Sequence, residues 1–360
     1  MDTYKIARLF DFEGNIISIE PYGDGHINDT YLVSTDGKTS YILQRLNTKI
    51  FKNYQGLMDN IQKVSAFLSD IITKEGGDVT RECLTLIPTK DNKHYVVVND
   101  DCWRAYIFVP DTIVYQIIDT PAIFENTGEA FGKFIARLDS FDASTLCEVI
   151  PDFHNTVDRY QKFLTAVEEN KSGRRDNVKE EIEFVKKRKD FMSLIVNALN
   201  NKEIPLRVTH NDTKLNNVLI DKTSGKAICI IDLDTIMPGS LLYDFGDSIR
   251  FGCNTALEDE PDLSKVNFDI ELYKSYCTGF LRGIGDKITQ KEIDMLHIGS
   301  IMMTLECGTR FLTDYLDGDL YFKTKYPEHN LVRCHTQFKL VECMEKASNE
   351  MIKIAKNCKI

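Results

Sequence analysis

The spacing of apolar residues changes near Pro110, and this change constrains the fold more than any other feature of the chain. Before it, short runs rich in β-branched and aromatic residues alternate with turn residues, which predicts strands. The predicted strands cover residues 16–20, 30–33, 41–43, 84–88, 94–98 and 103–109. One apolar stripe at helical spacing, over residues 55–74, predicts a helix among them. We therefore expect a small lobe of strands plus one helix.

After Pro110 the apolar residues recur at three- and four-residue intervals, which predicts a mainly helical second lobe. Helical segments are expected at residues 124–138, 157–169, 176–199, 264–281, 290–312 and 330–357, with short strands at 206–209, 218–220 and 228–231. A chain of 360 residues also exceeds the about 250–300 that one core usually organises. The expected fold is thus α+β and bilobal, with lobes at residues 1–108 and 109–360.

The charge balance limits the partners of this protein. The chain has 44 Lys and Arg against 55 Asp and Glu, a net charge of −11, which disfavours binding to nucleic acids and anionic membranes. Its ten cysteines are scattered and form no CxxC pair, as expected for reduced thiols in the cytosol. No apolar run approaches the about 18 residues of a membrane span, and the amino terminus has charges where a secretory signal would be apolar. We therefore expect a cytoplasmic protein with small-molecule partners.

The densest cluster of reactive side chains is the loop at residues 210–217, which is followed by a predicted strand. Asp212 precedes Asn217 by five residues, a spacing that suits a carboxylate acting on a hydroxyl group and an amide oxygen binding a metal. Asp232 ends a later apolar strand, where a carboxylate is costly unless it meets a cation. Taken singly, Asp212 and Asn217 could equally bond the loop backbone. The combination with Asp232 favours catalysis.

This loop, HxDxxxxN followed by a strand-ending Asp, resembles that of the aminoglycoside phosphotransferase and choline kinase superfamily, which has a protein-kinase-like fold. Longer strings resemble the N-acetylhexosamine 1-kinase branch of that superfamily. They lie at residues 23–31, 41–45, 209–214, 231–239 and 243–247, so the resemblance runs through nearly the whole chain.

The resemblance implies phosphoryl transfer from ATP, with Mg2+, to the anomeric (C1) hydroxyl of N-acetylglucosamine or N-acetylgalactosamine. It implies that Asp212 binds the acceptor hydroxyl and accepts its proton, while Asn217 and Asp232 hold the Mg2+ that bridges the ATP phosphates. Lys214, two residues after Asp212, can neutralise charge on the transferred group.

Other residues of the first lobe are candidates for binding ATP. Gly23 and Gly25 lie in a predicted hairpin tip whose backbone can approach phosphates, although two glycines between strands are often just a turn. Asn28 and Thr30 can add hydrogen-bond donors. The segment at residues 103–110 joins the two predicted lobes, as a hinge that binds adenine would.

No lysine stands where a protein kinase has its phosphate-binding lysine; Gln44 and Arg45 are found there instead. Strand alternation lets only one of the two face the nucleotide, and we select Arg45 because of its charge. A literal Asp-Phe-Gly begins at Asp244, but it lies beyond the strand end, so we expect Asp244 to cap the next helix or to tie the catalytic loop. His210 is expected to brace that loop through a backbone carbonyl.

Polar and aromatic residues alternate near residues 306–321, and this composition suits a sugar. Arg310 and Tyr321 are the predicted acceptor-binding residues, although a solvated helix end would have the same composition. Two other functions remain open. One is a related kinase for an aminoglycoside, choline or another sugar, and the other is a catalytically silent nucleotide-binding or scaffold protein. A polycationic aminoglycoside would favour a strongly acidic cleft.

Overall fold

The computed structural model describes residues 2–23 and 27–358 and divides the chain into two compact units. Unit 1 comprises Met1–Val114, Ser140–Pro151 and Asn216–Pro238, and unit 2 comprises Tyr115–Asp139, Asp152–Leu215 and Gly239–Ile360. The prediction placed one boundary after residue 108. The structure instead groups residues 216–238 with the first unit, because strand β8 (Val218–Asp221) pairs there with β6 (Thr112–Ile113).

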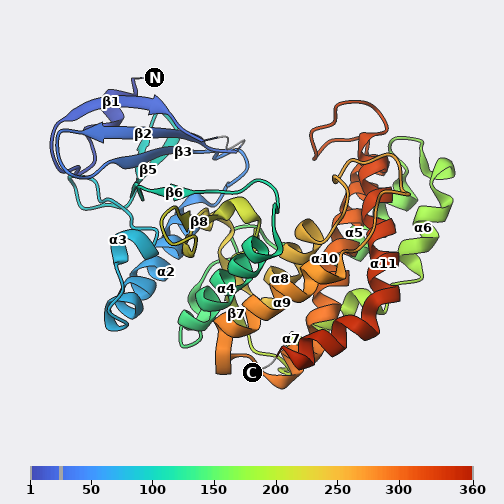
Figure 1. Ribbon diagram of the computed structural model, residues 1–360. Coiled ribbons are helices and arrows are strands. Elements are labelled where there is room, and N and C mark those ends of the chain that lie inside the picture. Colours follow the sequence, from blue (N-terminus) through green and yellow to red (C-terminus); the bar gives the residue numbers. More distant parts are fainter. Residues whose placement is uncertain (1, 24–26, 359–360) are drawn as a thin grey trace. The chain divides into compact units, whose positions relative to one another are not determined.

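The main feature of unit 1 is a five-stranded sheet in the order β1-β2-β3-β5-β4, whose neighbouring strands are all antiparallel (Figure 1). Its strands are β1 (Ile16–Pro21), β2 (Asp29–Thr35), β3 (Tyr41–Leu46), β4 (Val96–Val98) and β5 (Asp101–Ile107). One face carries the apolar core, in which Leu43, Trp103 and Ala105 pack against Ile6 of helix α1 (Thr3–Ala7). Alternation along each strand places the next residues, including Gln44 and Arg104, on the opposite face.

Helix α2 (Tyr54–Lys74) matches the predicted helix at residues 55–74, and Asn53 caps it by accepting from the Gly56 N–H at 3.1 Å. Helix α3 (Val79–Glu82) follows it. On the buried stripe of α2, Asn60 is fully buried and donates to the carbonyls of Cys147 at 2.8 Å and Ile236 at 2.9 Å. These bonds hold three separate stretches of unit 1 together.

A second sheet of unit 1 has the order β6-β8-β9, with β9 at Ala227–Ile230. Strands β8 and β9 form an antiparallel hairpin in which Val218 pairs with Ile230. The Ile231 N–H donates to the Asn217 carbonyl at 2.9 Å and so extends the hairpin by one step. As a result, the residues just before β8 and just after β9 lie at the same end of this hairpin.

Unit 2 is mainly helical, as the sequence predicted, and its longest helices, α10 and α11, run along each other (Figure 1). Its helices are α4 (Pro121–Arg137), α5 (Thr156–Glu169), α6 (Lys179–Lys186), α7 (Leu194–Asn200), α8 (Leu241–Gly252), α9 (Ile270–Ile284), α10 (Gln290–Asp317) and α11 (His329–Asn357). Strand β7 (Arg207–Thr209) is the partner of β10 (Met237–Gly239), whose last residue belongs to unit 2. Short 3-10 helices lie at Ala143–Thr145, Arg175–Asn177, Phe191–Ser193, Leu215–Asn217, Leu233–Thr235 and Gly285–Lys287.

Glycines allow α4 and α9 to pack unusually closely. A Cβ atom added to Gly279 of α9 would lie 1.9 Å from the Glu125 carbonyl oxygen, and one added to Gly128 of α4 would lie 2.4 Å from that of Tyr276. Backbone atoms cannot yield as a flexible side chain can, so a larger residue at either position would push the helices apart. Helix α4 also supplies the aromatic residues that surround His210 of the catalytic loop.

Some predicted elements differ from the observed ones. Residues 84–88 form no named strand; Leu86 makes an isolated bridge to Tyr106. The predicted helix at 176–199 is broken into α6, a 3-10 turn and α7. By contrast, the strand predicted at 103–109 is confirmed as β5, which pairs with β3, and the role of residues 103–110 as an adenine-binding hinge stays a prediction.

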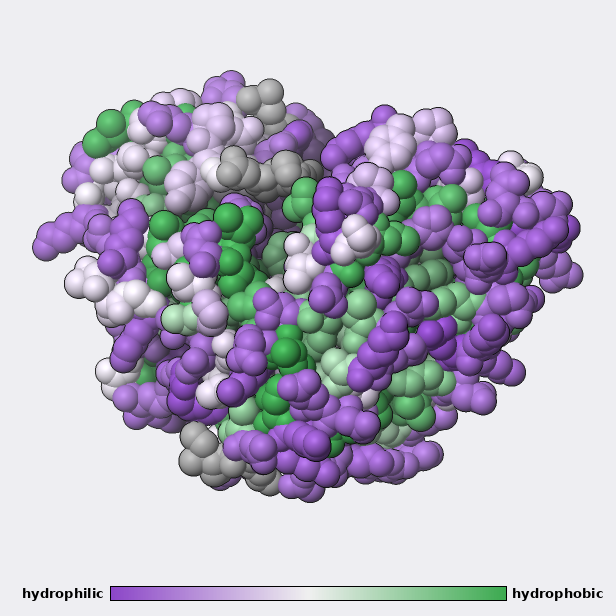
Figure 2. Space-filling model, turned by 45° about the vertical axis from the view of Figure 1, so that its right-hand side comes forward, coloured by the Kyte–Doolittle hydropathy of each residue, from purple (hydrophilic) through white to green (hydrophobic). Residues whose placement is uncertain are grey.

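The surface in Figure 2 is mostly hydrophilic, with hydrophobic patches between the polar side chains. Across residues 2–23 and 27–358, no helix is both long and apolar enough to cross a membrane.

Candidate active site

The first residues of the predicted catalytic loop, which belong to unit 2, are held in place by one buried carboxylate. Asp244, in the first turn of α8, accepts from the backbone N–H of His210 at 2.8 Å and from that of Asn211 at 2.7 Å. The Thr213 hydroxyl donates to the Asp244 carbonyl at 2.7 Å. The cap of α8 is Ser240, so of the two roles considered for Asp244, the structure has the tie to the loop.

This carboxylate is fully buried, and burial raises the pKa of Asp244 to about 6. The charge of His210 and the two backbone N–H donors oppose that rise. Asn211 lies in the left-handed region, with φ of 63°, a conformation that asparagine tolerates better than most residues. The loop backbone therefore has a defined conformation. The Asp244 carboxylate that fixes it is buried, and its desolvation costs free energy.

Asp212, the predicted base, points its carboxylate at Lys214, whose Nζ lies 2.8 Å from Oδ1. The Asp212 side chain is 27% exposed and that of Lys214 is 42% exposed, so a ligand can reach both. Burial alone lowers the pKa of Lys214, but the charge and hydrogen bond of Asp212 outweigh burial, and the pKa lies above its usual value. Nδ1 of His210 accepts from the Asp212 N–H at 3.3 Å, so the imidazole braces the loop through this N–H.

The predicted metal ligands, Asn217 and Asp232, both belong to unit 1. Asn217 directly precedes β8, and Asp232 follows β9 by two residues, so they lie at the same end of the hairpin. Asp232 has a left-handed backbone with φ of 60°, and it is exposed, whereas Asn217 is buried. In the described part of the chain, no group of three or more His, Cys, Asp or Glu side chains could hold a metal. One carboxylate and one amide oxygen fit Mg2+, which commonly takes its other ligands from phosphates and water.

Two residues later, Asp234 is buried and forms an ion pair that we did not predict. Its Oδ1 lies 2.5 Å from Nη1 of Arg104 on β5, and Asn28 donates to its Oδ2 at 2.7 Å. Arg104 is 1% exposed, and it also donates to the Gln44 side-chain oxygen at 2.9 and 3.1 Å. Burial lowers the pKa of Arg104, but the charge of Asp234 more than compensates and keeps the guanidinium charged. One feature of the sequence indicates such a pair: an arginine lies within an apolar strand, where a buried charge needs a partner.

The predicted ATP-binding residues fall into two groups in unit 1. Thr30 joins the Arg104 network, since its hydroxyl accepts from the Gln44 amide at 3.0 Å, and Asn28 joins it through Asp234. Arg45 lies on the opposite sheet face, where it forms ion pairs with Asp29 and, at 3.4 Å, with Asp101. Of the two residues considered for the phosphates, Gln44 is therefore the one on the Asp234 face. The phosphate role of Arg45 stays a prediction.

The predicted glycines of the hairpin tip are only partly described. Gly23 has a φ of 76°, and no atom lies within 4 Å of the place where a Cβ would be. Gly25 lies outside the described residues.

In unit 2, the residues predicted to bind the acceptor substrate lie at one cavity of about 120 Å³. Arg310 and Tyr321 both line it, with the centre of the Arg310 guanidinium 5.7 Å from the Tyr321 ring and 5.5 Å from that of Phe322. Tyr321 is 70% exposed, so its ring offers an open face. Asp314 shapes this segment by accepting from the backbone N–H groups of residues 320, 321 and 322 at 2.7–3.0 Å.

A short chain of contacts links this cavity to the catalytic loop within unit 2. Glu306, which is 1% exposed, accepts from Nδ1 of His154 at 3.0 Å. The His154 ring packs at 5.1 Å on that of Tyr243, the residue before Asp244. Burial raises the pKa of Glu306, but His154 and two nearby arginines outweigh it, and the pKa lies below its usual value.

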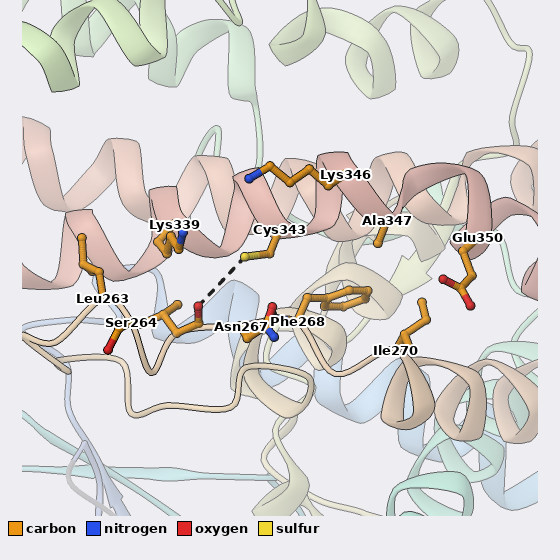
Figure 3. A pocket seen from close by; sticks show the side chains of 11 residues that line it. Leu263, Ser264, Asn267, Phe268, Ile270, Lys339, Cys343, Lys346, Ala347 and Glu350 are labelled. Carbon is orange, nitrogen blue, oxygen red and sulfur yellow. Dashed lines mark hydrogen bonds between the residues drawn. The ribbon is translucent and has the colours of Figure 1, made fainter.

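A larger hollow of about 550 Å³ lies elsewhere in unit 2, between α11 and the segment before α9 (Figure 3). Cys343 of α11 points toward this segment, with its sulfur 4.0 Å from the Val266 carbonyl oxygen (Figure 3). None of the predicted site residues lines the hollow. The predicted site residues therefore do not lie at the larger of the two cavities.

A model of the "Phosphotransferase enzyme family" matches residues 18–273. The match spans well over half of the chain, so this protein belongs to that family. It includes the catalytic loop, Asp232 and the Arg104 network, whereas Arg310 and Tyr321 lie beyond its end.

Solved structures of small-molecule kinases have a similar fold. A microcompartment-associated aminopropanol kinase matches with a TM-score of 0.63 and 16% identity over 97% of each chain. The amicoumacin kinase hAmiN, in complex with AMP-PNP, Ca2+ and Ami, matches with a TM-score of 0.59 and 13% identity over 94% of this chain and 92% of its own. The choline kinase LicA from Streptococcus pneumoniae has a TM-score of 0.51 and 13% identity, over 92% and 94%. These similarities confirm the predicted kinase-like α+β fold.

Proposed function

We propose that this protein is an N-acetylhexosamine 1-kinase, which transfers the γ-phosphoryl group of ATP to the anomeric hydroxyl of N-acetylglucosamine or N-acetylgalactosamine. The observation that carries the proposal is the catalytic loop, in which Asp212 is accessible while Asp244 fixes the backbone around it. Membership of the phosphotransferase family supports the same reaction type. Because ATP is a cytoplasmic co-substrate, we place the reaction in the cytoplasm.

In this proposal Asp212 accepts the hydrogen bond of the acceptor hydroxyl and takes its proton as the new P–O bond forms. Lys214, 2.8 Å from that carboxylate, orients Asp212 and offers positive charge to the phosphoryl oxygens. The raised pKa of Lys214 ensures that the ammonium is charged at neutral pH.

The metal and the phosphates are assigned to residues of unit 1. Asn217 and Asp232 supply one amide and one carboxylate oxygen for Mg2+, which neutralises phosphate charge when it is bound. The Arg104–Asp234 pair fixes the chain directly after Asp232 against the sheet. Three further side chains support this pair. Gln44 accepts from Arg104 and donates to Thr30, and Asn28 donates to Asp234.

The cavity favours a sugar over the cationic acceptors of related kinases. An amino alcohol or an aminoglycoside is positively charged, so it needs carboxylates or aromatic faces without competing cations. Here the guanidinium of Arg310 lines the cavity next to the exposed ring of Tyr321. Sugar oxygens can accept hydrogen bonds from Arg310, and the pyranose face can pack on Tyr321.

Release of ADP from ATP and Mg2+, measured with a panel of acceptors, tests the proposal. We expect turnover with N-acetylglucosamine or N-acetylgalactosamine and none with choline, ethanolamine or kanamycin. The product should show coupling between phosphorus and the anomeric proton by NMR. Phosphate on the 6-hydroxyl would contradict the anomeric assignment. Turnover with an amino compound alone would replace the sugar assignment, and no turnover with any acceptor would favour a silent protein.

Variants of the cavity test the acceptor residues separately. Replacing Arg310 by Gln or Tyr321 by Ala should raise the sugar KM about 10-fold or more for each lost good contact, while the KM for ATP changes little. A Lys339→Gln variant, at the distant hollow beside α11, is the matched control for a lost positive charge. Unaltered sugar kinetics in both cavity variants would remove these residues from the site and leave the kinase assignment intact.

A further inference from the structure

The acceptor cavity contains a second arginine that no prediction included. Arg159 of α5 lines it together with Arg310. Arg310 makes no hydrogen bond or ion pair with any residue that the structure describes. Its guanidinium lies 5.5–5.7 Å from three aromatic rings and interacts electrostatically with Glu306 and Arg159. A guanidinium has five N–H donors, so Arg310 is poorly satisfied by the protein itself.

Arg159 is only partly satisfied as well. Its Nη2 donates to the Phe153 carbonyl at 2.9 Å, but its buried Nε–H finds no acceptor. The nearest carboxylate, Glu306, lies 3.8 Å from that Nε, beyond hydrogen-bond reach. Burial lowers the pKa of Arg159, and repulsion by Arg310 lowers it further, which shows that the two cations are close enough to interact unfavourably.

The carboxylates near the cavity accept no hydrogen bond from these two arginines. Glu306 forms its hydrogen bonds with His154, at 3.0 and 3.2 Å. Asp314 is used by the backbone N–H groups of residues 320–322 and by Asn330. Asp317 lies 3.4 Å from Lys171. The remaining cation of the lining, Lys162, is paired with Asp158 at 2.5 Å. The lining itself has three cations, Arg159, Lys162 and Arg310, against two carboxylates, Asp314 and Asp317. The Nε–H of Arg159 and the N–H groups of Arg310 have no hydrogen-bond acceptor in the described part of the protein.

We propose that Arg159 and Arg310 form an anion-binding subsite for the acceptor, and that the sugars phosphorylated by this protein include ones that carry a carboxylate. The inference rests on the proposed function, because it assigns the charge of a substituent to the same acceptor cavity. A carboxylate presents two oxygens in one plane and fits the planar fork of a guanidinium.

A neutral sugar would offer the two guanidiniums hydrogen-bond acceptors without a charge. Its hydroxyl groups could accept some of the N–H donors, but they carry no charge to offset two cations that share one buried glutamate. A carboxylate supplies both hydrogen-bond acceptors and a negative charge. Lys214 and Asp212, which perform the transfer, are on another part of unit 2 and remain available for the reacting hydroxyl.

Matched pairs of acceptors test this inference. N-acetylmuramic acid is N-acetylglucosamine with a lactyl carboxylate, and glucuronic acid is glucose with its C6 oxidised to a carboxylate. With ATP and Mg2+, we expect kcat/KM to be at least about 10-fold higher for the acidic member of at least one pair, as a charge-assisted hydrogen bond supplies. In the Arg159→Gln variant, the ratio of kcat/KM for the acidic acceptor to kcat/KM for the neutral one should fall toward one.

The control is Arg175→Gln, which removes an exposed arginine after α5 whose guanidinium donates to the Val167 carbonyl and whose backbone N–H donates to the Asn170 side chain. It changes the net charge equally and should keep the ratio of the unaltered protein. Thermal melts verify that both variants are folded. If Arg159→Gln does not fold, Arg159→Lys, which keeps the charge but loses the fork, should lower the ratio in part.

The outcomes separate this inference from the proposed function. Turnover of neutral hexosamines with no preference for an acidic partner would overturn the anion subsite and leave the kinase assignment standing. A preference that survives in Arg159→Gln would also overturn it. If no sugar is phosphorylated, neutral or acidic, both the proposed function and the subsite fail.

Discussion

Replacing Arg104 by Met would leave Asp234 as a buried carboxylate without its cation. In the unaltered protein, the two side chains are 1% and 4% exposed and lie 2.5 Å apart. Removing one partner of such a pair typically costs about 3–5 kcal/mol, because the other charge remains buried. We therefore expect the free energy of unfolding to fall by about that amount. At about 2–4 °C per kcal/mol, the melting temperature should fall by roughly 6–20 °C.

The double variant Arg104→Met, Asp234→Leu removes both charges and should recover most of that loss. Apolar replacement of a whole buried pair is often neutral. Asn28 and Gln44 would still each lose a partner, at about 1 kcal/mol per hydrogen bond, so we expect a net loss of about 1–2 kcal/mol. The partly exposed pair Arg81–Asp221 in the same unit is the control, and Arg81→Met should cost less than about 1 kcal/mol.

Urea unfolding followed by circular dichroism measures these losses, and melts with Mg-ATP measure nucleotide binding. The double variant should be stable yet show a smaller Mg-ATP-induced shift, because Asp234 also fixes the backbone next to Asp232. Our reasoning is refuted if Arg104→Met is as stable as the unaltered protein, or if the double variant is as unstable as the worse single variant. The first result would mean that the pair is not buried in solution, and the second that the two charges do not compensate each other.

Three further predictions concern the carboxylates of the site. Asp212→Asn should lower kcat by a factor of about 10²–10⁴ with little change in the KM for ATP, and an unchanged kcat in a folded variant would exclude the base role. Asp232→Ala should abolish activity and the Mg-ATP-induced shift in melting temperature, whereas Asp244→Ala should mainly lower stability; the reverse pattern would exchange their roles. Because burial raises the pKa of Asp244 to about 6, protonation stabilises the fold. This contribution is complete below the unfolded value of 3.8 and is lost as the pH rises through 6, so the stability of the unaltered protein relative to Asp244→Asn should decrease between pH 4 and 7. Parallel pH dependences of the two proteins would contradict the buried ionisation.

The parts of the fold that the sequence predicts well are those with a long, regular pattern. Helix α2 was expected at residues 55–74 and spans Tyr54–Lys74, because its apolar stripe continues for about five turns. Helix α11 was expected at residues 330–357 and spans His329–Asn357. By contrast, residues 176–199 have helix-compatible composition but a stripe too weak to show the break between α6 and α7. Residues 84–88 do pair with β5, since the Ile87 N–H donates to the Ala105 carbonyl and the Ile107 N–H to the Thr85 carbonyl, but this pairing is so short that it amounts to one isolated bridge.

The candidate residues Asp212, Asn217 and Asp232 could be proposed from the sequence because they lie in one short stretch of it. Asp212 and Asn217 are five residues apart, and the hairpin that follows brings Asn217 and Asp232 to the same end of β8 and β9. The Arg104–Asp234 pair was missed because its members are 130 residues apart, one in strand β5 and the other in the 3-10 helix at Leu233–Thr235. An arginine within the apolar strand β5 indicated that a partner must exist, but not which carboxylate it is.

The choice between Gln44 and Arg45 shows how register decides what charge alone cannot. Alternation along a strand requires the two side chains to lie on opposite faces, and we selected Arg45 because phosphates are anionic. The register pairs Arg45 with Asp29 on β2, so a carboxylate already sits across from it, whereas Gln44 is paired with Thr30 and Arg104. The positive charge on the Asp234 face is thus supplied from β5, by Arg104, and β3 contributes an amide that orients it. The phosphate role of Arg45 stays a prediction, and the pairing of strands puts a second arginine, Arg104, on the neighbouring strand β5.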